Sequence, residues 1–150
     1  MRRALLEPLV RDEQRVLHAR LGAAIEAECA AGDGLAGWHA ELAQHYWRAA
    51  EPTKAAEHAW PAAIQALSVH AYSEAIPLLR ICLAADPAGA CRAAILERLG
   101  DAYVSVGVLA EAVAAYETLL ADARAQGDDV STGRALRKLA EVAHDKAIQP

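Results

Sequence analysis

The chain has 150 residues, of which 55% are hydrophobic, and 15 basic against 20 acidic residues give it a formal net charge of −5. This length is enough for one domain with a core. The acidic balance argues against direct binding to nucleic acid, which favours a basic surface. Three cysteines without a C-x-x-C spacing argue against a disulfide framework or a zinc site and favour a reducing cytoplasm. No apolar run has the length of a membrane span.

The composition favours helices. Alanine is abundant, phenylalanine is absent and only 5% of the residues are aromatic. Alanine is the best helix former and adds little volume, and no stretch alternates with a period of two. The sequence therefore predicts an all-α protein.

Glycine, proline and capping residues divide the chain into about seven predicted helices. Pro61 predicts a kink or break in the third helix, and Pro77 a later regular start of the fourth. Ser131 is expected to cap the seventh. Short loops predict antiparallel neighbours in one domain over 1–150, with a lead-in helix and turn over 1–35 and degenerate repeats over 36–146. The predicted helices are 10–30, 36–49, 52–70, 73–85, 91–106, 109–125 and 131–146.

The most regular stretch is LGDAYVSVGVLAEAVAAYETLL, residues 99–120. Gly100 and Ala112 are small residues on successive helices, and a tyrosine follows each of them on the same helix face. We expect the small residues to let the two backbones approach, with Tyr103 and Tyr116 filling the space beside that contact. Gly107 is expected to make the turn.

This stretch resembles the tetratricopeptide repeat, a helix-turn-helix unit with Leu-Gly, Tyr, Ala and aromatic markers. The resemblance implies a right-handed α-solenoid of antiparallel helix hairpins. Leu119 departs from the family, which favours alanine there. The markers are Leu96, Leu99, Gly100, Tyr103, Gly107, Ala112 and Tyr116. Weaker copies are marked by Leu42, Ala43, Tyr46 and Ala55, by Ala63, Ala75, Leu79 and Pro87, and by Leu139 and Ala140.

A second resemblance covers VLHARLGAAIEAE, residues 16–28, and ELAQHYWRAAEPTKAAEHA, residues 41–59. These segments look like the region that follows the ATPase core in large actinobacterial regulators. Such regulators include LuxR-type and SARP-type transcription regulators and cyclase-linked signalling ATPases. The resemblance implies a non-catalytic interaction or sensor arm that binds a peptide, partner protein or effector on its concave face. A free-standing adaptor or assembly scaffold is the alternative, and an enzyme is a remote one.

The tetratricopeptide resemblance also implies partner-binding residues, because the first helix of each repeat lines the inner groove. A mixed-charge groove would then bind a peptide or a partner helix. The alternative is ion pairing between stacked helices, Glu97 with Arg137. Trp38 and Trp47 of the first hairpin are further candidates, and core filling is the alternative for both and for Trp60. The groove positions are Glu97, Asp101, Val104, Arg134, Arg137 and Glu141.

No sequence pattern predicts a catalytic, cofactor or metal site. A phosphate-binding G-x-x-x-x-G-K-[ST] loop and a G-x-S-x-G nucleophile elbow are both absent. The G-x-G-x-x-G of residues 32–37 follows a predicted helix, so a helix end is the favoured interpretation over dinucleotide binding. The single Glu141-x-x-His144 pair is half of what a di-iron bundle needs. The six histidines are expected on the surface, with His18 and His45 partly buried against a carbonyl.

The two ends of the chain suggest self-association. Leu136, Leu139, Ala140 and Ala143 form one apolar stripe on the last predicted helix, and the segment from Leu5 to Val10 is also apolar. A terminal repeat normally carries a polar outer face. We therefore expect the stripe to dock on another copy or on a partner.

Overall fold

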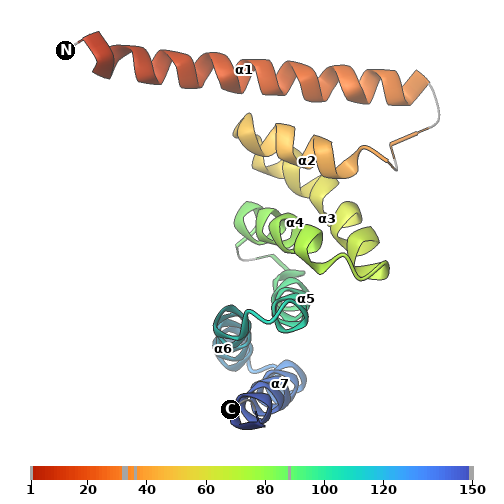
Figure 1. Ribbon diagram of the computed structural model, residues 1–150, viewed down its shortest axis with the longest axis vertical. Coiled ribbons are helices and arrows are strands. Elements are labelled where there is room, and N and C mark those ends of the chain that lie inside the picture. Colours follow the sequence, from red (N-terminus) through yellow and green to blue (C-terminus); the bar gives the residue numbers. More distant parts are fainter. Residues whose placement is uncertain (1, 32–33, 36, 88, 149–150) are drawn as a thin grey trace.

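The computed structural model describes residues 2–31, 34–35, 37–87 and 89–148, with side chains over 11–144 except 30–33, 36 and 88. These residues form seven α-helices and no strand, which confirms the all-helical prediction (Figure 1). The helices are α1 (Arg2–Ala31), α2 (His39–Arg48), α3 (Pro52–Ser68), α4 (Tyr72–Ala85), α5 (Arg92–Ser105), α6 (Leu109–Gln126) and α7 (Asp129–Ile148).

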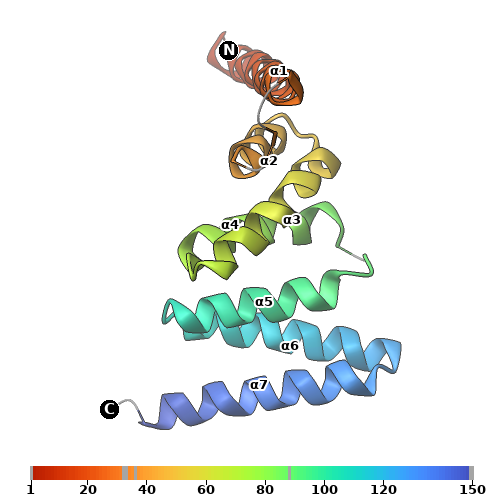
Figure 2. The ribbon, with the colours of Figure 1, turned by 90° about the vertical axis from the view of Figure 1, so that its right-hand side faces the viewer.

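The helices are stacked in chain order along the long axis of the molecule. Each packs against its neighbours in sequence, and α2 also contacts α4, while α5 contacts α7. Figure 2 shows α5, α6 and α7 side by side at one end, and Figure 1 shows α1 crossing the other end and reaching past α2. The side chains of Leu5 to Val10, whose apolar run was singled out in the sequence, lie outside the described residues.

Three predicted helix starts are wrong, and the first is that of α2, which begins at His39 instead of residue 36. α1 begins at Arg2 instead of near residue 10, so Pro8 lies inside the helix and not before it. α7 begins at Asp129, and Asp128 caps it instead of Ser131: its carboxylate accepts a hydrogen bond from the Ser131 backbone N–H at 3.0 Å. The bonds from Ser131 hold the pKa of Asp128 below its usual value.

The two internal prolines do not interrupt their helices. α3 runs without a break through Pro61, and α4 begins at Tyr72, five residues before Pro77. The break at Pro61 and the late start of α4 are therefore absent, while the kink that was the other prediction for Pro61 stays a prediction. Packing of both helices against each other and against their neighbours compensates for the hydrogen bonds that the prolines remove.

Four helices end in the same tight turn. In each turn one residue adopts a left-handed conformation, and the N–H after it bonds to the carbonyl five residues earlier. Gly107 and Gly127 make two of these turns, as their sequence positions predict, while Ala50 and His70 adopt positive φ angles of 60° without being glycine. The short turns place consecutive helices next to each other. The four bonds are Glu51 to Tyr46, Ala71 to Ala66, Val108 to Tyr103 and Asp128 to Ala123.

The core is thin and rich in alanine. Its largest cluster joins α2, α3, α4 and α5, and smaller clusters join α5, α6 and α7. Small side chains let the helices approach closely, so each contact between helices depends on a few large residues. The largest fully buried ones are Tyr46, Tyr116, Leu42, Leu79 and Leu119.

Two tyrosines each lie against a glycine of the preceding helix. A Cβ atom on Gly100 would lie 2.3 Å from Cε1 of Tyr116, and one on Gly22 would lie 2.9 Å from Cζ of Tyr46. The sequence predicts a close contact at Gly100, but the structure fills it with Tyr116 itself. Ala112 is fully buried one turn earlier, in the same cluster as Tyr116.

Enlarging Ala112 tests this packing. We expect Ala112→Leu to lower the free energy of unfolding by about 1–3 kcal/mol, because the extra methyl groups overpack a site with no exposed surface. Urea denaturation measures the change. Ala114→Leu on the same helix is the control, since Ala114 is exposed at the edge of an open hollow. Equal midpoints for the Ala112 variant and the unmodified chain would contradict the packing.

Candidate protein-interaction site

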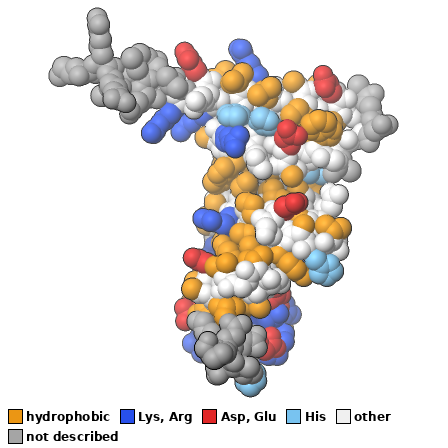
Figure 3. Space-filling view, viewed as in Figure 1, with side chains coloured by type: hydrophobic (Ala, Val, Ile, Leu, Met, Phe, Trp, Pro, Cys, Tyr) orange, Lys and Arg blue, Asp and Glu red, His pale blue; other side chains and the backbone are white. Residues whose placement is uncertain are grey.

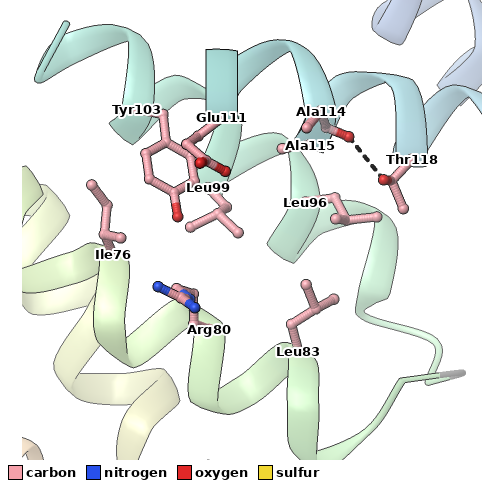
Figure 4. Close-up of a pocket in the computed structure, with 10 residues that line it drawn as sticks. All are labelled: Ile76, Arg80, Leu83, Leu96, Leu99, Tyr103, Glu111, Ala114, Ala115 and Thr118. Carbon is pink, nitrogen blue, oxygen red and sulfur yellow. Dashed lines mark hydrogen bonds between the residues drawn. The ribbon is translucent and has the colours of Figure 1, made fainter. Parts of the chain in front are cut away.

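Two neighbouring hollows along α4 could bind a partner. One hollow of about 480 Å³ opens between α4 and the α5–α6 hairpin (Figure 4). A second, of about 400 Å³, lies between α2 and α4. Arg80 lines both hollows, and we call the two together the α4 groove. It spans four of the seven helices.

The first hollow has an apolar floor and a charged rim. Leu96 and Leu99 are buried at its base. Figure 4 shows Arg80 of α4 and the Tyr103 hydroxyl of α5 directed into it, with Glu111 of α6 at the side. Neither Arg80 nor Glu111 forms an ion pair within the described part of the chain. A cation and an anion on opposite sides of an apolar floor can orient a polar ligand.

The second hollow includes Trp47, one of the residues that the sequence singled out. Its side chain is 42% exposed and lines the hollow beside Pro77 and Ile81. A large aromatic residue exposed next to apolar neighbours is typical of binding hot spots. Core filling does not describe Trp47 at this position, and its role in binding a partner stays a prediction.

The other tryptophans lie apart from the α4 groove. Trp38 is 44% exposed at the residue before α2. Trp60 is half-buried against the main core cluster, and the guanidinium of Arg98 lies 5.7 Å from the centre of its ring. Core filling, the alternative for all three, therefore describes Trp60.

The charged candidates on α5 and α7 contact one another. Arg134 donates a hydrogen bond to Glu97 at 3.1 Å, and Lys138 donates one to Asp101 at 2.6 Å. The expected Glu97–Arg137 pair is wrong, because Arg137 lies one turn further and bonds to Glu141 at 2.6 Å. Val104 is half-buried beside Tyr116. These residues tie α5 to α7, and their role in binding a partner stays a prediction.

A polar cluster that the sequence did not predict joins α1 to α2 and α3. Nδ1 of His18 lies 2.9 Å from Nδ1 of His45, and Nδ1 of His39 lies 3.1 Å from Nδ1 of His58. Glu26 accepts a hydrogen bond from Nε2 of His58 at 2.9 Å. We call these five residues the histidine clamp, and Figure 3 shows histidine side chains where α1 meets α2.

The histidine clamp corrects the expectation of surface histidines. His58 is 7% exposed, and His18 and His45 hold each other instead of a carbonyl. The Tyr46 hydroxyl also donates to Glu26, at 2.6 Å, and its ring stacks on His58. These contacts join residues 19 to 32 positions apart, so no local spacing in the sequence could indicate them.

Burial and mutual repulsion determine the protonation of the histidine clamp. Burial lowers the pKa of His18 and of His39, and the neighbouring His45 and His58 lower each further. The hydrogen bond from Tyr46 lowers the pKa of Glu26, and bonds from His58 add to this. Each imidazole pair can share one N–H between its two ring nitrogens, with one ring as donor and the other as acceptor.

Stability should accordingly decrease in mild acid. In the folded chain the pKa values of His18 and His39 lie below the ordinary 6.5. At a pH between the lowered pKa of each histidine and 6.5, the unfolded chain therefore binds more protons than the folded chain. We expect the urea midpoint to be constant above about pH 7.5 and to fall as the pH drops through 6.5. A further fall should follow below pH 4.5, the ordinary pKa of Glu26.

A variant can assign the first decrease to the histidine clamp. His18→Gln should flatten the fall in midpoint between pH 7.5 and about pH 5.5. His144→Gln, at an exposed position of α7, should leave it unchanged. An equal slope in the His18 variant and the unmodified chain would show that the clamp does not set the pH response.

The described residues contain no group of three or more His, Cys, Asp or Glu side chains placed to hold a metal ion. No helix among them has the length and apolarity that crossing a membrane requires. The G-x-G-x-x-G segment falls partly on residues 32–33 and 36, outside the described residues. Gly34 has a φ of +90°, as a turn after a helix requires.

Comparison with known proteins gives no relative. No protein-family model matches the chain, and no curated protein or solved structure matches it significantly. Function is therefore inferred from the residues and their arrangement.

Proposed function

We propose that this chain is a non-catalytic protein-interaction or sensor module with a tetratricopeptide-like, right-handed solenoid arrangement. It acts in the cytoplasm as the helical arm of a bacterial signalling ATPase or transcription regulator. The α4 groove is its binding surface, and the ligand is a peptide or helix of a partner protein. The observation that carries the proposal is an open apolar floor between Arg80 and Glu111. Neither residue forms an ion pair within the described part of the chain.

The shape and chemistry of the α4 groove suit an amphipathic segment. Hydrophobic side chains at i, i+3 and i+4 of a bound helix would enter the hollow above Leu96 and Leu99, a common mode of peptide recognition. An acidic side chain of the ligand would reach Arg80, and a basic one would reach Glu111. Opposite charges at the rim would fix the direction of the bound segment more than they add affinity.

Binding in this position could produce a signal. The α4 groove is built from α2, α4, α5 and α6. The first half of the molecule, α1–α4, meets the second half, α5–α7, chiefly where α4 packs on α5. A ligand that touches both sides of this junction would favour one angle between the halves. A domain attached to either end would then experience the change.

The test uses a random-peptide display library selected against the whole chain. Enriched peptides should be amphipathic and carry an acidic residue, and Arg80→Glu should weaken their binding by about tenfold or more, equal to about 1.4 kcal/mol. Trp47→Ala should weaken those that extend to the second hollow. Arg124→Glu, an exposed charge reversal on α6, is the matched control and should have no effect. Enriched peptides insensitive to both groove variants, or no enrichment, would reject the proposal.

A further inference from the structure

The side of α1 that faces away from α2 carries large apolar side chains. Val16 and Leu17 are 52% and 57% exposed, and every residue from 11 to 17 is exposed. The opposite side of the helix makes the contact with the stack, through buried Gly22 and the histidine clamp. Figure 3 shows hydrophobic and charged side chains next to each other on α1. This outer face is therefore free for another molecule.

The outer face has an ordered charge pattern. Glu13, Val16, Leu17 and Arg20 follow at i, i+3, i+4 and i+7, so they form one stripe along the helix. All four residues line one shallow hollow of about 510 Å³. Asp12 beside the stripe pairs with Arg15 at 3.6 Å, whereas Glu13 and Arg20 form no ion pair within the described residues.

The charge pattern of the outer face is complementary to the same face of a second, antiparallel copy. A second α1 placed antiparallel, with the two-fold axis between residues 16 and 17, brings Glu13 opposite Arg20 of the other copy. The same operation brings Val16 opposite Leu17, and each contact occurs twice. A parallel arrangement would place Glu13 opposite Glu13 and Arg20 opposite Arg20, which repel. The face thus matches a second copy in one orientation.

We propose that two copies of this chain form a dimer through the outer faces of α1, paired antiparallel about residues 16 and 17. The stripe buries Val16 and Leu17 of both copies and makes two symmetric ion pairs. The contacts of α1 with its own α2 and α3 are on the opposite side of the helix, so helices α2–α7 of the two copies lie on opposite sides of the α1 pair. This proposal is independent of the α4 groove, which would be present twice in the dimer.

The other predicted surface for self-association, the stripe on α7, is less suited. Leu136 is 45% exposed and Ala140 and Ala143 are exposed, but Leu139 packs against the third core cluster. Arg137 and Glu141 beside it already pair within their own helix. Within the described side chains, no self-complementary pair of unpaired charges flanks this stripe. The observations therefore favour α1 as the interface.

Charge reversal on the outer face tests the dimer by sedimentation velocity over a concentration series of the full chain. The unmodified chain should shift from monomer to dimer as its concentration rises. Glu13→Arg and Arg20→Glu should each abolish the dimer, because each places like charges opposite one another. Mixing the two variants should restore a dimer, since one copy then carries two arginines and the other two glutamates. The double variant should also dimerise.

The controls separate this interface from others. Leu136→Glu on α7 should leave the dimer intact, and circular dichroism melts should show that both charge variants stay folded, as expected for exposed positions. Restoration on mixing also excludes misfolding as the cause of the loss. A chain that stays monomeric at all concentrations, a dimer unaffected by Arg20→Glu, or a dimer lost only in Leu136→Glu would each overturn the proposal.

Discussion

Replacing Gly100 by alanine is expected to lower the free energy of unfolding by about 1–3 kcal/mol, the range for overpacking a core. The added Cβ would lie 2.3 Å from the Tyr116 ring. That ring is 1% exposed, and its hydroxyl donates to Asp101 at 2.5 Å. The ring therefore cannot swing aside without losing the hydrogen bond or opening the core. Alanine inside a helix is otherwise more favourable than glycine by about 0.5–1 kcal/mol. The cost of overpacking must exceed this gain for the free energy of unfolding to fall.

Gly133 provides the matched control for Gly100. It also lies inside a helix, α7, but a Cβ there would meet nothing within 4 Å. Gly133→Ala should therefore raise the free energy of unfolding by about 0.5–1 kcal/mol. Urea denaturation of both variants should give midpoints that move in opposite directions. A rise in both would mean that Tyr116 has room to move, and that the contact does not hold α5 to α6.

The sequence was sufficient to predict the helices but not the contacts between them. The predicted turns depend on local residues: Gly107 and Gly127, for example, end helices because glycine adopts a positive φ without strain. Helix starts with more than one possible capping residue were predicted less accurately. Asp128 and Ser131 are both good capping residues, and only the structure shows that the aspartate accepts the bond.

The candidate site could be predicted only in part, because it combines residues far apart in the chain. Trp47 was one of the predicted partner-binding residues, with core filling as the other interpretation, and it lines the α4 groove. Arg80 and Glu111 were not, since a charged residue on a helix is ordinary until its neighbours are known. The charges on α5 and α7 were expected to line a groove, yet their spacing equally fits the pairs Glu97–Arg134 and Asp101–Lys138 that the structure shows.

The largest local effect is expected at Glu26, whose carboxylate joins α1 to the rest of the molecule. It accepts hydrogen bonds from Tyr46 and His58, which are fully and almost fully buried. Glu26→Ala would leave both donors without this partner, and each buried unsatisfied group costs about 1–3 kcal/mol. The main contact of α1 is with α2, so the cost falls on docking of this one helix. We expect α1 to detach while α2–α7 stay folded.

Hydrogen exchange resolves such a local change, because amides report the opening of their own helix. In Glu26→Ala the α1 amides after residue 11 should exchange faster than in the unmodified chain, and those of α5 and α6 should be unchanged. Glu28→Ala is the control, because Glu28 is exposed on the same helix. Tyr46→Phe should have a smaller effect, since it removes one of the two donors and leaves the ring packed on Gly22. Protection of α1 that is equal in the Glu26 and Glu28 variants would show that packing alone, without the Glu26 hydrogen bonds, holds the helix in place.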